Sequence, residues 1–194
     1  MMNDPARNPY ASGSGTGVDS NNGAAQFRGA VQTGKLITFG LLMGLLTTTS
    51  ILTVLWITSG PHEKPVFRFD EDSMIFIVIG FGKLIICSIG WVVMRLLFNR
   101  KIAEILKSSS EPFPVPIRDD TLLPPQTQTA IQAMVTSNLI GQALMEGPAM
   151  LNAILMFIEH NAIFAIPVVI GFVGVLLQLP TVSKYKSRLE NAAL

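Results

Sequence analysis

The chain has 194 residues, of which 49% are hydrophobic and only 14% are charged. Because soluble domains usually carry about 25% charged residues, this balance excludes an ordinary soluble domain and indicates a protein of the lipid bilayer. A formal net charge of +1 argues against nucleic acid as a partner, since a chain that grips phosphates along a duplex needs a large basic excess.

The N-terminal part of the chain changes character near residue 35. Residues 1–34 are rich in Gly, Ser, Asn and Ala, which predicts a disordered tail because such a segment cannot bury enough apolar surface. Leu36 to Ser59 is nearly uncharged and, at about 23 residues, long enough to cross a hydrocarbon core of about 30 Å. Gly40 and Gly44 lie four residues apart, so another copy of the chain could approach this face closely and form a homo-oligomer.

A second span is expected from Met74 to Phe98, which completes a transmembrane hairpin over residues 35–98. The segment Asn99 to Lys107 is expected to continue as an amphipathic helix along the membrane surface. Five prolines follow between residues 112 and 125. They predict an extended linker, so residues 99–129 are interpreted as a cytoplasmic connector, although such prolines could also recruit a groove-binding partner.

A second hairpin is predicted over residues 130–180. Its third span ends near Ile158, a break falls at Glu159-His160-Asn161, and a fourth span covers Ala162 to Leu179. Residues 181–194 are expected to form a basic tail. The predicted fold class is therefore all-α, with four transmembrane helices in two antiparallel hairpins.

Basic residues flank the predicted spans mainly on one side. They gather in the N-terminal tail, in the connector and at the C-terminus, whereas the other two loops hold few. Cytoplasmic loops carry an excess of Lys and Arg, so both termini are expected in the cytoplasm and the protein in the inner (plasma) membrane. An even number of spans agrees with that orientation.

The third span contains a carboxylate, Glu146, near its middle. A charge at this depth costs at least a few kcal/mol, so Glu146 is a candidate functional residue. Asn138, Gln142 and Glu146 recur every four residues and share one helix face. Pro148 removes a backbone N–H and is expected to kink the helix beside the carboxylate.

Lys83 on the second span is the expected partner of Glu146. Counted inward from the outer ends of the two helices, their depths differ by about 4 to 5 Å at 1.5 Å per residue. The preferred interpretation is a buried ion pair that fixes helix packing, or a carboxyl group kept neutral. The alternative is that Glu146 carries a proton or cation across the membrane.

Other chemistry has little support in the sequence. His62 and His160 lie beside Glu63 and Glu159 and are weak metal-site candidates, more simply read as solvated interfacial residues. The chain has no Gly-rich phosphate loop, serine elbow, HExxH pair or nucleophile with an evident base. We therefore expect no enzyme activity, no metal and no cofactor.

Two resemblances to known classes of membrane protein add to these patterns. The segment Gln142 to Phe157, QALMEGPAMLNAILMF, resembles the carboxylate-bearing helix of the rotary ATPase proteolipid (subunit c), which would imply that Glu146 is the ion carrier and that the protein forms rings. The whole chain resembles uncharacterised bacterial multi-pass membrane proteins with an EGxAxxN-like third helix and an exit at Pro180-Thr181. That resemblance implies a fold and a location but no activity. The sequence thus predicts a non-enzymatic integral membrane protein, with an ion-translocating subunit as the alternative.

Overall fold

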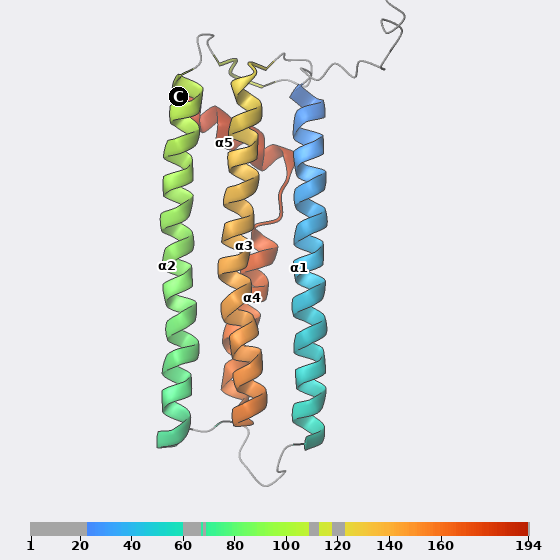
Figure 1. Ribbon diagram of the computed structural model, residues 1–194, viewed down its shortest axis with the longest axis vertical. Coiled ribbons are helices and arrows are strands. Elements are labelled where there is room, and N and C mark those ends of the chain that lie inside the picture. Colours follow the sequence, from blue (N-terminus) through green and yellow to red (C-terminus); the bar gives the residue numbers. More distant parts are fainter. Residues whose placement is uncertain (1–22, 60–66, 68, 109–112, 118–122, 194) are drawn as a thin grey trace, which may run out of the picture.

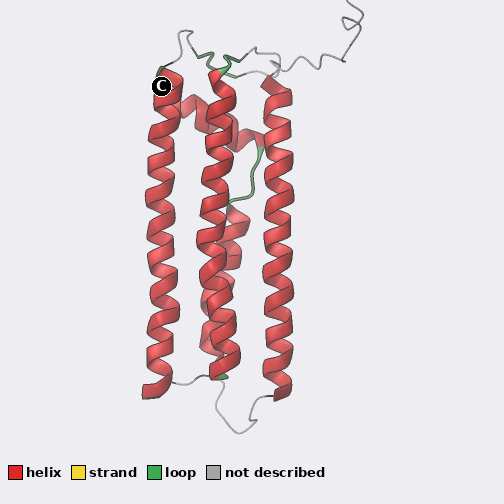
Figure 2. Cartoon of the chain, viewed as in Figure 1, coloured by secondary structure: helices red, strands yellow, loops and turns green. Residues whose placement is uncertain are grey.

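The computed structural model describes residues 23–59, 67, 69–108, 113–117 and 123–193. These residues form helices joined by connecting segments (Figure 2), which confirms the predicted all-α fold class. The elements are α1 (Gly23–Ser59), α2 (Glu71–Lys107), α3 (Gln126–Glu159), the short 3-10 helix η1 (Ala162–Phe164), α4 (Ala165–Leu177) and α5 (Val182–Ala193).

The predicted break after the third span is confirmed. Helix α3 ends at Glu159, and His160 takes a left-handed conformation with φ 48° and ψ 40°. The side chain of Asn161 then accepts a hydrogen bond of 3.1 Å from the backbone N–H of Ile163, which starts η1. Because an Asx side chain can satisfy a free N–H of the first turn, this short segment both stops one helix and starts the next.

Helix α3 is the centre of the bundle. It contacts α1, α2 and α4, whereas no contact joins α1 to α2 among the described residues. Figure 1 shows α3 between α1 and α2, with α4 packed behind it. Helices α1 and α2 do run antiparallel, but the first predicted hairpin is not a packed unit, because α3 lies between its two helices.

Small residues let the helices approach α3 closely. A Cβ atom added at Gly171 of α4 would lie 2.7 Å from the Cβ of Ala149, and one at Gly141 of α3 would lie 2.8 Å from Cδ1 of Trp91. A Cβ at Gly80 of α2 would overlap the side chain of Asn152. Without a hydrophobic driving force between helices in lipid, such close backbone contacts are a main source of association.

Three helices, α1, α2 and α3, are long and apolar enough to cross a membrane. A fourth span is reached only if α4 and α5, which are bent by 74° at the break between them, are taken as one broken span. Large apolar side chains cover the outer faces of the bundle, for example Leu36 at 73% and Ile86 at 68% exposed. These features indicate a multi-pass membrane protein with three to four candidate spans.

Three expected segments are arranged differently in the structure, for a shared reason. The tail was expected to reach residue 34, but α1 already begins at Gly23, while residues 1–22 lie outside the described part. The segment Asn99–Lys107 is helical, as predicted, but it belongs to the same uninterrupted helix as the second span, and the expected basic tail contains α5. All three segments bury apolar side chains in one core, the α5 cluster, which consists of Phe27, Val31, Ile102, Leu106, Ile117, Leu123, Ala130, Ile131, Met134, Tyr185 and Leu189.

The connector also packs into the α5 cluster. Ile117 and Leu123 are buried in the α5 cluster, and the backbone N–H of Ile117 donates a hydrogen bond of 2.9 Å to Oε1 of Glu190 on α5. The described part of the proline-rich segment therefore packs against α5, which an unattached linker would not do.

Candidate functional site

The polar residues predicted on one face of α3 have separate partners. Gln142 is fully buried, and its Nε2 donates a hydrogen bond of 2.6 Å to Oγ1 of Thr38 on α1. Asn138 Nδ2 donates a hydrogen bond of 3.2 Å to the hydroxyl oxygen of Tyr185 on α5. These two residues tie α3 to different elements, because a buried polar group in an apolar bundle must find a partner.

Glu146 is half-buried, and within the described part of the chain it forms no hydrogen bond or ion pair. Lys83 is exposed on α2. The residues of this part of α2 that face the core are Gly80, Leu84 and Cys87.

The expected ion pair between Lys83 and Glu146 is therefore not formed among the described residues. At 100° per residue, Lys83 lies about 60° to one side of the buried stripe of α2, so its side chain lies at the exposed edge of that stripe and not among the buried residues. The two charges lie at similar depth by residue count, but similar depth alone does not bring two side chains into contact.

Asn152 is a buried residue to which the sequence analysis gave no role. Helix α3 continues through Pro148, and Asn152 Nδ2 donates hydrogen bonds to the carbonyl oxygens of Pro148 (2.8 Å) and of Gly80 on α2 (3.1 Å). A signal was present in the sequence, since an amide inside an apolar span must find an acceptor in its own bundle.

The weak metal-site candidates are not brought together. His62 lies outside the described residues. His160 follows the last residue of α3, and the centroid of its ring lies 6.2 Å from the ring centroid of Phe157. In the part of the chain that the structure describes, no group of three or more His, Cys, Asp or Glu side chains could hold a metal ion.

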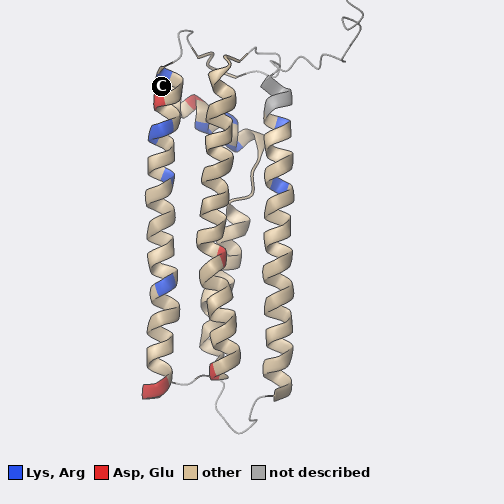
Figure 3. Cartoon of the chain, in the orientation of Figure 1, with Lys and Arg blue, Asp and Glu red and all other residues tan. Residues whose placement is uncertain are grey.

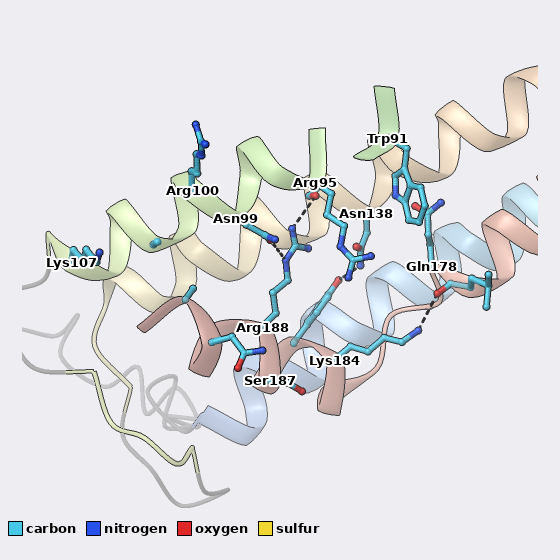
Figure 4. Close-up of a pocket in the computed structure, with 16 residues that line it drawn as sticks. Trp91, Arg95, Asn99, Arg100, Lys107, Asn138, Gln178, Lys184, Ser187 and Arg188 are labelled. Atoms are coloured by element: carbon cyan, nitrogen blue, oxygen red, sulfur yellow. Dashed lines mark hydrogen bonds between the residues drawn. The ribbon is translucent and has the colours of Figure 1, made fainter. Parts of the chain in front are cut away.

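The polar end of the bundle contains a cavity of about 880 Å³, here called the basic cleft. It lies between α2, α3, α5 and the end of α4 (Figure 4), at the end of the molecule where Lys and Arg gather (Figure 3). Its described lining contains no carboxylate and five basic residues, Arg95, Arg100, Lys107, Lys184 and Arg188.

Polar contacts position the basic side chains of the cleft. Arg188 donates hydrogen bonds to Oδ1 of Asn99 (2.7 Å, from Nε) and to Oγ of Ser137 (3.3 Å, from Nη2). The Arg95 guanidinium carbon lies 5.9 Å from the ring centroid of Trp91, a cation–π geometry. Burial, and after it the neighbouring charge of Arg95, hold the pKa of Arg188 below its usual value.

Lys184 closes the cleft at the end of α4. Its Nζ donates hydrogen bonds of 3.1 Å to the backbone carbonyl oxygens of Leu177 and Leu179, which are free because the helix ends there. In Figure 4, Arg95 and Arg188 reach toward one another from α2 and α5, whereas Arg100 points away from them. Arg95 and Arg188 therefore lie together in the cleft, and Lys184 lies at its α4 end.

No protein-family model matches the chain, and no curated protein and no solved structure shows a significant similarity to it. The comparisons thus identify no family. The resemblance to the rotary ATPase proteolipid rests on the segment Gln142 to Phe157 alone. The structure shows a helical protein with three to four long apolar helices that could span a membrane.

Proposed function

We propose that the chain is a non-enzymatic, multi-pass protein of the inner (plasma) membrane, with both termini on the cytoplasmic side. The observation that carries the orientation is the gathering of Lys and Arg toward one end of the bundle (Figure 3). Glu71, Asp72 and Glu159 lie at one end of the helices, and Glu104 and Glu190 lie at the other. Most of the described basic residues lie toward the other end, namely Arg28, Lys35, Arg95, Arg100, Lys101, Lys107, Lys184, Lys186 and Arg188. An excess of Lys and Arg is typical of the cytoplasmic side.

The role that the geometry supports best is structural. Hydrogen bonds from Gln142 and Asn152 hold α3 to α1 and α2, and the α5 cluster fixes α5 across the basic end of the bundle. The protein would thereby hold an ordered helical surface at the cytoplasmic face. The absence of enzyme activity is proposed from the sequence alone, which shows no motif of a catalytic site.

Assembly into a homo-oligomer through Gly40 and Gly44 stays a prediction. A Cβ added at either glycine would have no neighbouring atom within 4 Å, so this face of α1 is open to lipid or to a second copy.

Accessibility of single cysteines tests the orientation. In a Cys87→Ala background, Ser183→Cys on α5 and Asp72→Cys on α2 place thiols at two exposed positions at opposite ends of the bundle. A membrane-impermeant maleimide is expected to label Asp72→Cys in intact spheroplasts and Ser183→Cys only in inverted vesicles. The reverse pattern would contradict the proposed orientation, and labelling of both from one side would contradict a spanning bundle.

A second candidate function is proton or cation translocation through Glu146. It is supported by an intramembrane carboxylate that is half-buried and has no partner among the described residues, since such groups often mark ion pathways. The test is proton flux into proteoliposomes that carry an internal pH dye. If Glu146 is the carrier, Glu146→Gln abolishes the flux, whereas Glu159→Gln at the end of the same helix preserves it. Absence of flux in the wild type, or equal flux in both variants, rejects this candidate.

A further inference from the structure

The basic cleft holds positive charge that its own chain does not neutralise. None of its five basic residues forms an ion pair within the described part of the chain, and the described lining contains no Asp or Glu. Like charges in a partly buried site repel one another, so an anion that enters the cleft is favoured by all of them together.

Hydrogen-bond donors remain available at the centre of the cleft. Arg95 forms no hydrogen bond in the described part of the chain besides its contact with Trp91. Arg188 directs two of its five N–H groups to Asn99 and Ser137, and Lys184 directs two of its three to backbone carbonyls. The contacts orient these side chains while leaving N–H groups for a ligand.

The donor set fits a tetrahedral oxyanion. Guanidinium groups bind phosphate oxygens with two parallel hydrogen bonds, and an ammonium group adds a compact charge. The cleft also has an apolar side, formed by Trp91 and Leu177, where the apolar part of α2 and the end of α4 meet it. Indole rings typically lie at the level of lipid headgroups, so this position gives access both to the membrane surface and to water.

We propose that the basic cleft is a binding site for a phosphate-bearing anion, with Arg95, Lys184 and Arg188 contacting its phosphate oxygens. The anion is either the headgroup of an acidic phospholipid or a free phosphate compound. The competing explanation is that the basic residues of this end attract acidic membranes without a defined site, as polybasic segments do.

Trp91 provides the measurement, because it lines the cleft and the chain has only one other tryptophan, Trp56, near the opposite end of α1. The full chain with Trp56→Phe is purified in a maltoside detergent, which contains no phosphate. Its fluorescence is titrated with inorganic phosphate against chloride at matched ionic strength, and with phosphatidylglycerol against diacylglycerol. A saturable change with phosphate identifies a soluble ligand, and one with phosphatidylglycerol alone identifies a lipid headgroup. Either result supports the site.

Matched charge removals separate a defined site from general attraction. R95Q/R188Q removes two charges from the cleft, whereas K35Q/K101Q removes two exposed charges that do not line it. We expect R95Q/R188Q to weaken binding by at least about tenfold, and K35Q/K101Q by less than about twofold, because charge-assisted hydrogen bonds are lost only in the first variant.

Folding is checked by size-exclusion chromatography and circular dichroism. If R95Q/R188Q does not fold, R95Q alone carries the test, since Arg95 forms no hydrogen bond or ion pair among the described residues. The conservative R95K/R188K variant is expected to retain part of the affinity. The proposal is overturned if neither ligand gives a saturable change, or if the two charge-removal variants weaken binding equally.

Discussion

The contact between Gly80 and Asn152 shows how a single residue decides the packing of two helices. Asn152 is fully buried and donates a hydrogen bond of 3.1 Å to the carbonyl oxygen of Gly80, and a Cβ at Gly80 would overlap the same side chain. The amide cannot move aside freely, because it also holds the carbonyl of Pro148. Any side chain at position 80 must therefore separate α2 from α3 or break these hydrogen bonds.

Gly80→Ala is expected to destabilise the bundle by about 1 to 3 kcal/mol, the usual cost of adding a methyl group to a well-packed interface. Gly82→Ala is the matched control, because a Cβ at Gly82 has no neighbour within 4 Å. The control is expected to be neutral or slightly stabilising, by up to about 1 kcal/mol, since alanine favours the helix. The measurement is the unfolding free energy in mixed detergent micelles.

A double variant tests the cause of that loss. Adding Asn152→Ala to Gly80→Ala removes the side chain that the new methyl group would meet. The two changes should therefore cost less together than the sum of their separate costs. Equal stabilities of Gly80→Ala and Gly82→Ala would show that α2 and α3 do not touch at this point.

At the scale of the helices, local signals predicted where the apolar segments end. Helix α1 ends at Ser59, before Gly60 and Pro61, and the Glu159-His160-Asn161 break forms as expected. These helix ends depend on residues adjacent in the sequence, so they can be predicted from it. Helix α5 is different, because its buried side chains are only Tyr185 and Leu189, a single pair four residues apart. A pattern this short does not predict a packed helix by itself. The side chains that cover it are the other members of the α5 cluster, which come from distant parts of the chain.

The basic cleft was not predicted for the same reason. Its residues were recognised in the sequence, but as loop and tail charges that report orientation. They become a site only because α2 continues past residue 98 and α5 folds back across it. The candidate pair of Lys83 and Glu146 was predicted from depth, but it does not form among the described residues, because Lys83 is exposed on α2. Depth follows from counting residues, whereas facing depends on which helices are neighbours.

At the scale of the whole molecule, the order of the helices in space differs from their order in the chain. Helix α3 lies between α1 and α2, although α2 follows α1 directly in the sequence (Figure 1). In lipid, apolar faces gain little from meeting one another, so small residues and polar contacts decide which helices are neighbours. Helix α3 supplies such residues toward each partner, with Gln142 facing α1, Asn152 facing α2 and Ala149 facing α4.

Paired cysteines test this arrangement with a short thiol-specific cross-linker in a Cys87→Ala background. The pair at positions 38 and 142 is expected to react, because Thr38 and Gln142 share a hydrogen bond. The pair at positions 45 and 84 lies at similar depth in α1 and α2 and should not react, since α3 separates these helices.

The pair at positions 83 and 146 should likewise stay unlinked within one chain, because Lys83 is exposed on α2 and forms no ion pair with Glu146 among the described residues. A monomeric product from this pair, formed as readily as the one from positions 38 and 142, would restore the ion pair inside the bundle. A product of twice the monomer mass would instead place Lys83 of one copy beside Glu146 of another. Each of these opposite charges costs free energy when it is unpaired in lipid. The second product would therefore show that an oligomer lowers this cost by pairing the two charges between copies.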